Sequence, residues 1–264
     1  MYKKYLIDKS INNVCVVGDL HGKFNLLKFK IKESGITNTL IIIAGDCGFG
    51  FEKQEYYKQQ YNRLKKILFE QNVFVVFVRG NHDDKTFFDG EKINFKNFIA
   101  TPDYSVINVT TESGDKNILC VGGAISADRT DRINYQQIKG NKSYWEDEFP
   151  IYEPTILNEI KSDGINIDVV VTHTSPNFAP LLNKNGTSSW LLVDSKLSKD
   201  LDNERQTITE IYNHIIQDKH PVKVWLYGHF HEHSVMYSNE EVKFVMLDMF
   251  GGKYNSWDIY QIYF

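Results

Sequence analysis

Short apolar runs separated by amphipathic segments set the rhythm of the first third of the chain. The runs at 13–18, 39–45 and 73–78 are rich in β-branched residues and have the length of strands. The second is nearly all apolar, which is typical of a central strand buried on both faces. The segments between them predict two helices, one ending near residue 33 and one spanning about 52–71. The order β-α-β-α-β predicts a parallel sheet with right-handed crossovers.

The pattern changes from about residue 104. Strand-like runs at 104–110 and 117–123, separated by the turn-like ESGD, predict an antiparallel hairpin. Helices are expected at 153–162 and 203–217, strands at 165–173 and 222–228, and short antiparallel strands in the tail 233–264, with Gly251–Gly252 as a break. The chain should therefore form two sheets, a central one with parallel members and a second built from hairpins.

Two long stretches, 124–150 and 174–200, show no strong period. They are expected to form loops and short helices over the ends of the strands. The chain has no internal repeat, low-complexity tract or linker. We therefore expect a single domain over residues 1–264.

Polar blocks rich in Gly or Pro follow most of the apolar runs. They read GDLHG (18–22), GDCG (45–48), GNHD (80–83), THTSP (172–176) and GHFH (228–231). An α/β fold presents ligands in this way, because a buried strand ends in a sharp turn and leaves polar side chains at its carboxyl end. The oxygen and nitrogen donors, suited to Mg, Mn, Fe, Zn, Co or Ni, are Asp19, His21, Asp46, Asn81, His173, His229 and His231. A single ion with open positions uses fewer donors, so we predict two metal ions that share one carboxylate.

The composition favours a soluble globular protein over a membrane protein or a binder of duplex nucleic acid. A hydrophobic content of 42% and a charged content of 24% are ordinary for a soluble globular protein. A net charge of −4 and a pI near 6.1 give no general attraction to polyanions, which argues against binding of duplex nucleic acid. No stretch resembles a signal peptide or a membrane span, and the three cysteines are odd in number and far apart. We expect a cytoplasmic protein that does not contact membranes.

All five polar blocks, in this order, resemble the motifs of the calcineurin-like metallophosphoesterases, and the resemblance covers nearly the full length. It implies an α/β protein with a four-layer α-β-β-α sandwich. It also implies hydrolysis of a phosphoester by a metal-bridging hydroxide held between two divalent ions, with no side-chain nucleophile. Mn²⁺ is the expected activating ion, and the same donors accept Fe, Zn, Ni, Co or Mg.

The resemblance further implies a role for each residue. Asp19, His21 and His231 would bind the first metal, Asp46 would bridge, and Asn81, His173 and His229 would bind the second. His82 would be the catalytic histidine that protonates or stabilises the leaving oxygen, a contribution of about 10²–10⁴ in rate. Asp83 would orient the His82 ring or cap a following short helix, and we favour the cap. Cys47 is expected to be a packing residue.

The chain departs from the serine/threonine protein phosphatase branch, which carries GDxVDRG and GNHE. Residues 45–50 read GDCGFG, so the second Asp and the phosphate-clamping Arg of that branch are absent, and the third block ends in Asp83. Another cation must then bind a terminal phosphate. The segment GGAISADRTDR (122–132) resembles a GGA-x-S-x-D segment of a bacterial and phage subgroup, and it offers Arg129 or Arg132.

Competing interpretations remain for the residues of these aperiodic stretches. Asp128–Arg129 and Asp131–Arg132 have the sequence of surface ion pairs, and Tyr144, Trp145 and Trp190 either pack or line a substrate wall.

The leading functional hypothesis is a phosphomonoesterase acting on a phosphorylated small molecule or related substrate, such as a nucleotide, a sugar phosphate or a phosphoprotein. A phosphodiesterase acting on cyclic nucleotides or nucleic-acid ends is the alternative. A non-catalytic scaffold of the same fold is less favoured, because every donor position of the motifs is filled. A nuclease within a repair complex is disfavoured by the acidic charge balance.

Overall fold

The apolar runs form strands buried on both faces, as their composition predicts. A computed structural model describes residues 1–179, 187–251 and 259–264. In the strand β3 (Thr39–Ile43) every residue is buried. Leu40 and Ile42 pack into a core between two sheets, and Ile41 and Ile43 pack into a core beneath helices. Apolar residues at consecutive positions are therefore required because both faces of this strand are covered.

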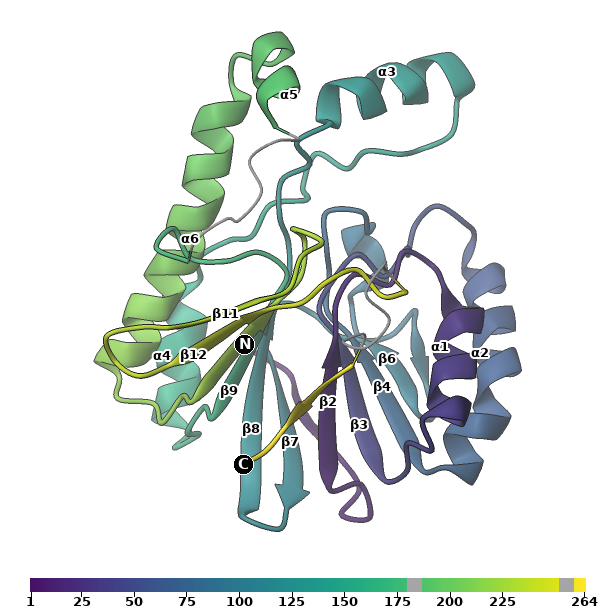
Figure 1. The fold of residues 1–264 in the computed structure, drawn as a ribbon, viewed down its shortest axis with the longest axis vertical. Coiled ribbons are helices and arrows are strands. Elements are labelled where there is room, and N and C mark those ends of the chain that lie inside the picture. Colours follow the sequence, from purple (N-terminus) through teal and green to yellow (C-terminus); the bar gives the residue numbers. More distant parts are fainter. Residues whose placement is uncertain (180–186, 252–258) are drawn as a thin grey trace.

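The first sheet carries the parallel strands of the βαβ units. Its spatial order is β13 (Tyr260–Ile262), β2 (Asn13–Val17), β3, β4 (Val73–Phe77), β6 (Phe98–Ala100) and β5 (Asn94–Phe95). The four inner strands are parallel, whereas β13 and β5 pair antiparallel at the two edges. Helices α1 (Phe24–Glu33) and α2 (Gln54–Glu70) cover its outer face (Figure 1).

The second sheet is not built from hairpins alone, so that expectation was wrong. Its spatial order is β1 (Lys4–Leu6), β7 (Ser105–Thr111), β8 (Gly114–Val121), β9 (Val169–Thr172), β10 (Val224–Tyr227), β12 (Lys243–Met246) and β11 (Ser234–Tyr237). The predicted hairpin is confirmed as β7 and β8, and β11 and β12 form a second antiparallel pair. The strands β8, β9, β10 and β12 are nevertheless parallel. Helices lie between β8, β9 and β10 in the chain and make the return crossovers that parallel pairing requires.

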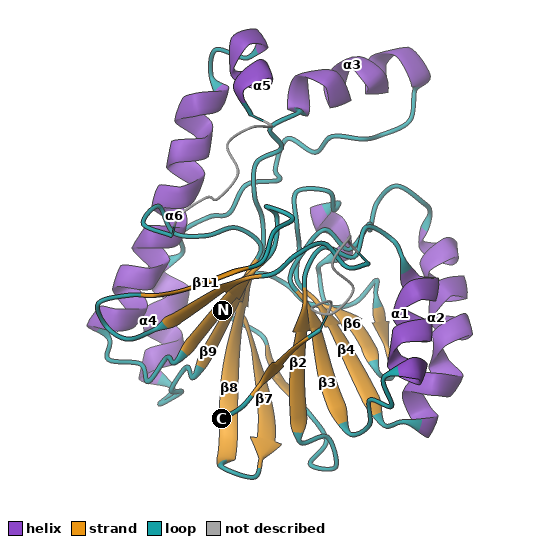
Figure 2. Ribbon diagram, viewed as in Figure 1, coloured by secondary structure: helices purple, strands orange, loops and turns teal. Residues whose placement is uncertain are grey.

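The two sheets face each other and helices cover their outer faces, as Figure 2 shows. One apolar core lies under α1 and α2, a second lies between the sheets, and a third lies under α4 (Pro154–Ser162) and α6 (Leu197–Gln217). This is the four-layer α-β-β-α arrangement that the family resemblance implies. It places the carboxyl ends of the parallel strands of both sheets at the same end of the molecule (Figure 1).

The two aperiodic stretches project beyond those strand ends. The first contains α3 (Arg129–Lys139), which is longer than the short helices expected there, and the second contains α5 (Ser188–Val193) and the start of α6. Arg129 joins them, since its guanidinium pairs with Asp194 at 2.6 Å and with Asp200 at 2.7 Å. Residues 180–186 of the predicted loop and Gly252 of the predicted break lie outside the described residues.

Within the described ranges, none of the helices combines the length and the apolar character needed to cross a membrane.

Candidate metal centre

The five polar blocks meet between the carboxyl ends of the two sheets. The first three follow β2, β3 and β4, and the last two follow β9 and β10. Backbone hydrogen bonds join blocks that are far apart in the sequence: the amide of His21 donates to the carbonyl of Asp46 at 2.7 Å, and the amide of Gly228 donates to the carbonyl of His173 at 3.1 Å. The strand ends therefore bring together the side chains that the sequence singled out.

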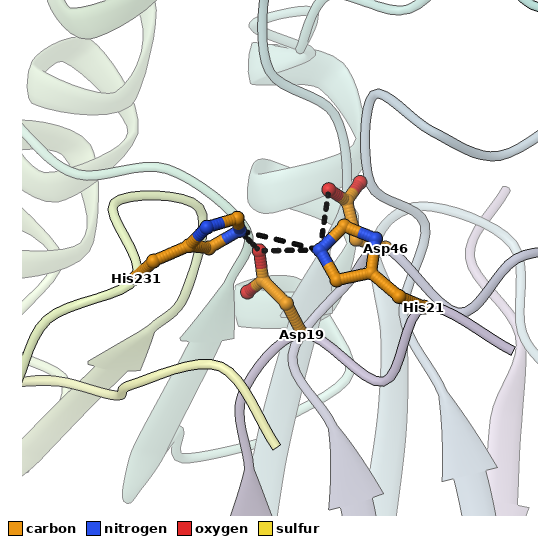
Figure 3. A group of neighbouring side chains, drawn as sticks. All are labelled: Asp19, His21, Asp46 and His231. Atoms are coloured by element: carbon orange, nitrogen blue, oxygen red, sulfur yellow. Dashed lines mark hydrogen bonds and ion pairs between the residues drawn. The ribbon is translucent and has the colours of Figure 1, made fainter. Parts of the chain in front are cut away.

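A first group of donors converges on one point (Figure 3). One donor atom each from Asp19, His21, Asp46 and His231 lies within 4.8 Å of the others. Nε2 of His231 lies 2.8 Å from Oδ2 of Asp19 and 3.2 Å from Nε2 of His21. The carboxylates are buried while His21 remains partly exposed. Imidazole nitrogens and carboxylate oxygens converging at this spacing form a donor set that fits a divalent cation.

A second group of donors lies on the other side of Asp46. Nε2 of His173 is 3.1 Å from Oδ1 of Asp46 and 2.9 Å from Oδ1 of Asn81. The other ring nitrogen of His173 bonds the carbonyl of Ala44 at 2.7 Å. A carbonyl bonded to one ring nitrogen orients the imidazole and leaves the other nitrogen to face a metal. Asp46 therefore lies between the two groups, with Oδ1 toward His173 and Oδ2 3.9 Å from Nε2 of His21.

His229 and His82 flank these two groups. The ring of His229 lies 5.0 Å from that of His173 between centroids, and its backbone amide donates to Oδ1 of Asp19 at 2.8 Å. Nδ1 of His82 lies 3.5 Å from Oδ2 of Asp46, and its backbone amide donates to Oδ1 of the same carboxylate at 2.8 Å. Imidazole side chains are thus available on both sides of the bridging position.

The backbone at the donors is strained. His21, Asp46, His229 and His231 have positive φ angles of 47°, 46°, 70° and 53°. Side chains other than glycine adopt this region at a cost of about 1–3 kcal/mol each, and such strain gathers at functional sites. Asp and His are among the residues enriched there. Four strained donors in one cluster indicate that the fold is used to hold these side chains in place.

Opposite charges stabilise the ionised carboxylates. Burial raises the pKa of Asp46, but the neighbouring His82 and His173 outweigh it and hold that pKa well below its usual range. Burial lowers the pKa of His173, yet the Asp46 and Asp19 carboxylates raise it to about 10. Burial, and then the charge of His173, lower the pKa of His229 to about 3. The field that holds a proton on His173 also favours a divalent cation in its place.

Comparison with known families agrees with this geometry. A model of the calcineurin-like phosphoesterases matches residues 13–233.

The chain belongs to this family.

Two solved structures are similar to this chain. TT1561 from Thermus thermophilus is 11% identical, with a TM-score of 0.50, and the match covers 90% of each chain. A dimetal phosphatase from Danio rerio is 10% identical, with a TM-score of 0.45, and the match covers 90% of this chain and 88% of that one. No curated protein sequence matches the chain. Family membership makes the chain a metal-dependent phosphoesterase with a dimetal centre, and the Asp and His cluster provides donors for it.

Asp83 does not have the local role expected of it in this phosphoesterase. Its carboxylate accepts four backbone N–H groups, from Cys47 at 2.9 Å, Gly48 at 2.8 Å, Phe49 at 2.9 Å and Gly80 at 2.8 Å. The short helix that follows is capped by Asp84, which accepts from the amide of Thr86, so the predicted cap was wrong. Asp46, rather than Asp83, contacts the ring of His82. Asp83 thus holds the loop that carries Asp46.

The two candidate arginines have different surroundings. The pairs of Arg129 with Asp194 and Asp200 raise its pKa and neutralise its charge, and they differ from the predicted pair with Asp128. Nε of Arg132 pairs with Asp128 at 2.6 Å. Its Nη1 donates to the carbonyl of Ser143 at 3.3 Å. Burial of the imidazole lowers the pKa of His82, and the charge of Arg132 lowers it further.

The aromatic and thiol side chains mostly pack. Trp145 is buried and meets Phe51 edge-on at 5.0 Å between ring centroids. Cys47 is buried, as expected, and its thiol donates to the carbonyl of Val78 at 3.1 Å. Tyr144 instead lines a cavity of about 350 Å³ next to Arg129. Tyr144 therefore has open space beside it, unlike the buried Trp145 and Cys47.

Two buried carboxyl groups, which were not among the residues predicted from the sequence, lie behind the centre. Glu148 binds Ser126, and Glu204 binds the amide of Ile125 at 2.5 Å and the hydroxyl of Thr174. Burial raises the pKa of Glu148 to about 8 and that of Glu204 to about 7. The GGA-x-S pattern after a strand was a sequence signal that could have pointed to Ser126. Glu148 lies in the aperiodic stretch 124–150, where no pattern marks it as a buried residue.

Gly45→Ala is expected to destabilise this phosphoesterase more than an alanine at a glycine of similar backbone angle. Gly45 has a φ of 101°, and a Cβ there would lie well under 3.0 Å from Nδ1 of His173. Gly114 has a φ of 98° and open space at the same position. Both variants carry the cost of a strained backbone, and only Gly45→Ala adds overpacking, worth about 1–3 kcal/mol. Urea unfolding of both variants measures the difference in their free energies of unfolding. Equal losses of stability would show that the loop around His173 shifts to accommodate the added methyl group.

Proposed function

We propose that this phosphoesterase hydrolyses phosphomonoesters, with a nucleotide, a sugar phosphate or a phosphoprotein as the substrate class. The observation that carries the proposal is the position of Asp46, whose two oxygens face separate groups of donors. Asp19, His21 and His231 would hold one divalent ion, Asn81, His173 and His229 would hold the other, and Asp46 would bridge. When bound, the ions supply an activated water as nucleophile and neutralise the phosphoryl oxygens.

His82 is assigned to the leaving group. Its ring contacts the Asp46 carboxylate and lies 5.3 Å from the ring of His21 between centroids, so it stands at the edge of the centre and remains partly exposed. A protonated imidazole there donates to the oxygen that leaves. Arg132 is a better candidate than Arg129 for contact with a terminal phosphate, because among the described residues one carboxylate pairs with its guanidinium, whereas two pair with that of Arg129.

A cap above the strand ends supports the proposed preference for monoesters. Helices α3 and α5 both lie beyond the strand ends (Figure 1). Ion pairs of Arg129 with Asp194 and Asp200 join α3 to the segment that follows α5. A cap of this kind favours a substrate with one ester arm over a long diester. We further propose Mn²⁺ as the activating ion and a cytoplasmic location, in keeping with the donor set and with the buried, unpaired thiols Cys15, Cys47 and Cys120.

Reconstitution with Mn²⁺ followed by parallel assays on p-nitrophenyl phosphate and bis-p-nitrophenyl phosphate tests the proposal. We expect a higher kcat/KM on the monoester, and loss of activity on addition of a chelator. Asp46→Asn serves as the blank for contaminating phosphatases. A preference for the diester would overturn the substrate class and move the assignment to a phosphodiesterase.

A further inference from the structure

We propose that Ser126, held by the buried carboxyl group of Glu148, is a positioning residue that fixes the orientation of the Asn81 amide toward the second metal position. The inference rests on the dinuclear centre of the proposed function. It adds two residues that lie outside the five polar blocks.

The contacts of Asn81 show why its orientation needs to be fixed. Its Nδ2 donates to Oγ of Ser126 at 2.9 Å, and its Oδ1 faces Nε2 of His173 at 2.9 Å. Only the oxygen of an amide binds a divalent cation, because the NH₂ group is a donor with no free lone pair for the ion. Rotation of the amide by half a turn would place NH₂ where the ligand atom belongs. The hydroxyl of Ser126 favours the productive orientation.

Ser126 is itself held at two points. Its backbone amide donates to Oε1 of Glu148 at 2.7 Å, and its hydroxyl bonds Oε2 at 2.6 Å. Ser126 and Glu148 are both buried, with exposed fractions of 1% and 2%. Because the Ser126 hydroxyl donates its hydrogen to Glu148, its oxygen is left as an acceptor for the Asn81 amide. The serine therefore cannot turn away without leaving buried polar groups unpaired, which costs about 1–3 kcal/mol for each group.

The segment that carries Glu148 is held by the loop after β4, which also carries Asn81. Arg79, fully buried at the end of β4, donates to the carbonyl of Glu148 at 2.8 Å and to that of Phe149 at 3.2 Å. Arg79 lies two residues before Asn81 in the chain. The strand end, the segment of Glu148, Ser126 and the Asn81 side chain thus form a closed ring of contacts. Both oxygens of the buried Glu148 carboxyl group bond Ser126, and this fixes the hydroxyl that accepts from the Asn81 amide.

Isothermal titration calorimetry of Mn²⁺ binding to the metal-free protein tests this proposal without an activity assay. The wild type is expected to take up two ions. Ser126→Ala removes the acceptor for the Asn81 amide, and it should weaken binding of the second ion by about 10–100-fold while leaving the first unchanged. Ser126→Thr keeps the hydroxyl and should restore the affinity. Ser105→Ala is the matched control, since Ser105 is a buried serine whose hydroxyl donates to the carbonyl of Pro102.

A double-mutant cycle separates orientation from general damage to the site. In Asn81→Asp both side-chain atoms are oxygens, so the orientation of the group no longer matters. In that background, Ser126→Ala should then weaken binding of the second ion far less than it does in the protein with Asn81. An equal loss in both backgrounds would overturn the positioning role. Ser126→Cys keeps the volume with a weaker acceptor, and it replaces Ser126→Ala if that variant fails to fold.

The outcomes distinguish this inference from the function on which it rests. Uptake of a single ion by the wild type would contradict the dinuclear centre itself. Uptake of two ions by the wild type, with wild-type affinities in Ser126→Ala, would leave the centre in place and reject Ser126 as its positioning residue.

Discussion

Asp46→Asn is expected to lower kcat/KM of the Mn²⁺-loaded enzyme by about 10³–10⁴, a loss of about 4–5.5 kcal/mol in transition-state stabilisation. The carboxylate of Asp46 faces His173 through one oxygen and His21 through the other. An asparagine of the same shape offers one oxygen and no charge, so it cannot bridge two cations or offset their repulsion. It can still accept the backbone N–H of His82, which now donates to Oδ1 at 2.8 Å. The loop should therefore keep its shape.

Steady-state kinetics and metal analysis of the same samples check this prediction. The variant should hold fewer than two ions per chain under conditions that saturate the wild type. Asp115→Asn is the matched control, because Asp115 lies exposed at the end of the β7–β8 hairpin and bonds only Thr110 among the contacts described. Wild-type turnover with two bound ions in Asp46→Asn would mean that Asp46 does not bridge.

The sequence predicts the site well where the signal is local. GDLHG and GDCG directly follow apolar runs, and the carboxyl ends of neighbouring parallel strands must lie at one edge of a sheet. The pairing of β2 with β3 therefore brings Asp19 and Asp46 together without further information. Strain at His21 and Asp46 follows from the same turns, since each turn reverses the chain within a few residues.

Features that depend on distant partners could not be predicted. Arg129 pairs with Asp194 and Asp200, about 65 and 70 positions along the chain, rather than with the adjacent Asp128. A charged side chain pairs with the opposite charges that the fold brings close to it. Adjacent residues on a helix point in different directions, so they seldom pair with each other. Glu148 likewise looks like a surface residue in sequence, yet its carboxyl group is buried, with both oxygens bonded to Ser126.

The second sheet shows a related limit. Alternation of helix and strand after residue 150 predicts parallel pairing, but the preceding hairpin suggests an antiparallel sheet. Both are present, because β8 pairs antiparallel with β7 on one side and parallel with β9 on the other. The short edge strand β1 has only three residues, with too few positions for a period to emerge.

His82→Ala is expected to lower kcat by about 10²–10⁴ on an alkyl phosphate and by less on p-nitrophenyl phosphate. An alkoxide leaves poorly without a proton, whereas p-nitrophenolate is a stable anion that needs little assistance. The variant removes the imidazole, whose Nδ1 lies 3.5 Å from Asp46, but it retains the backbone N–H that holds the Asp46 carboxylate. The variant should therefore still bind both metal ions, and this result would distinguish His82 from the metal ligands.

A series of monoesters with leaving groups of increasing basicity measures the effect. The rate of the variant should fall more steeply along the series than the rate of the wild type. His214→Ala is the control, because His214 lies on α6 beside Tyr152 and Asp218, in the outer layer of the molecule. Parallel slopes for the variant and the wild type, with both ions bound, would exclude proton donation by His82 and leave it a role in binding the phosphoryl group.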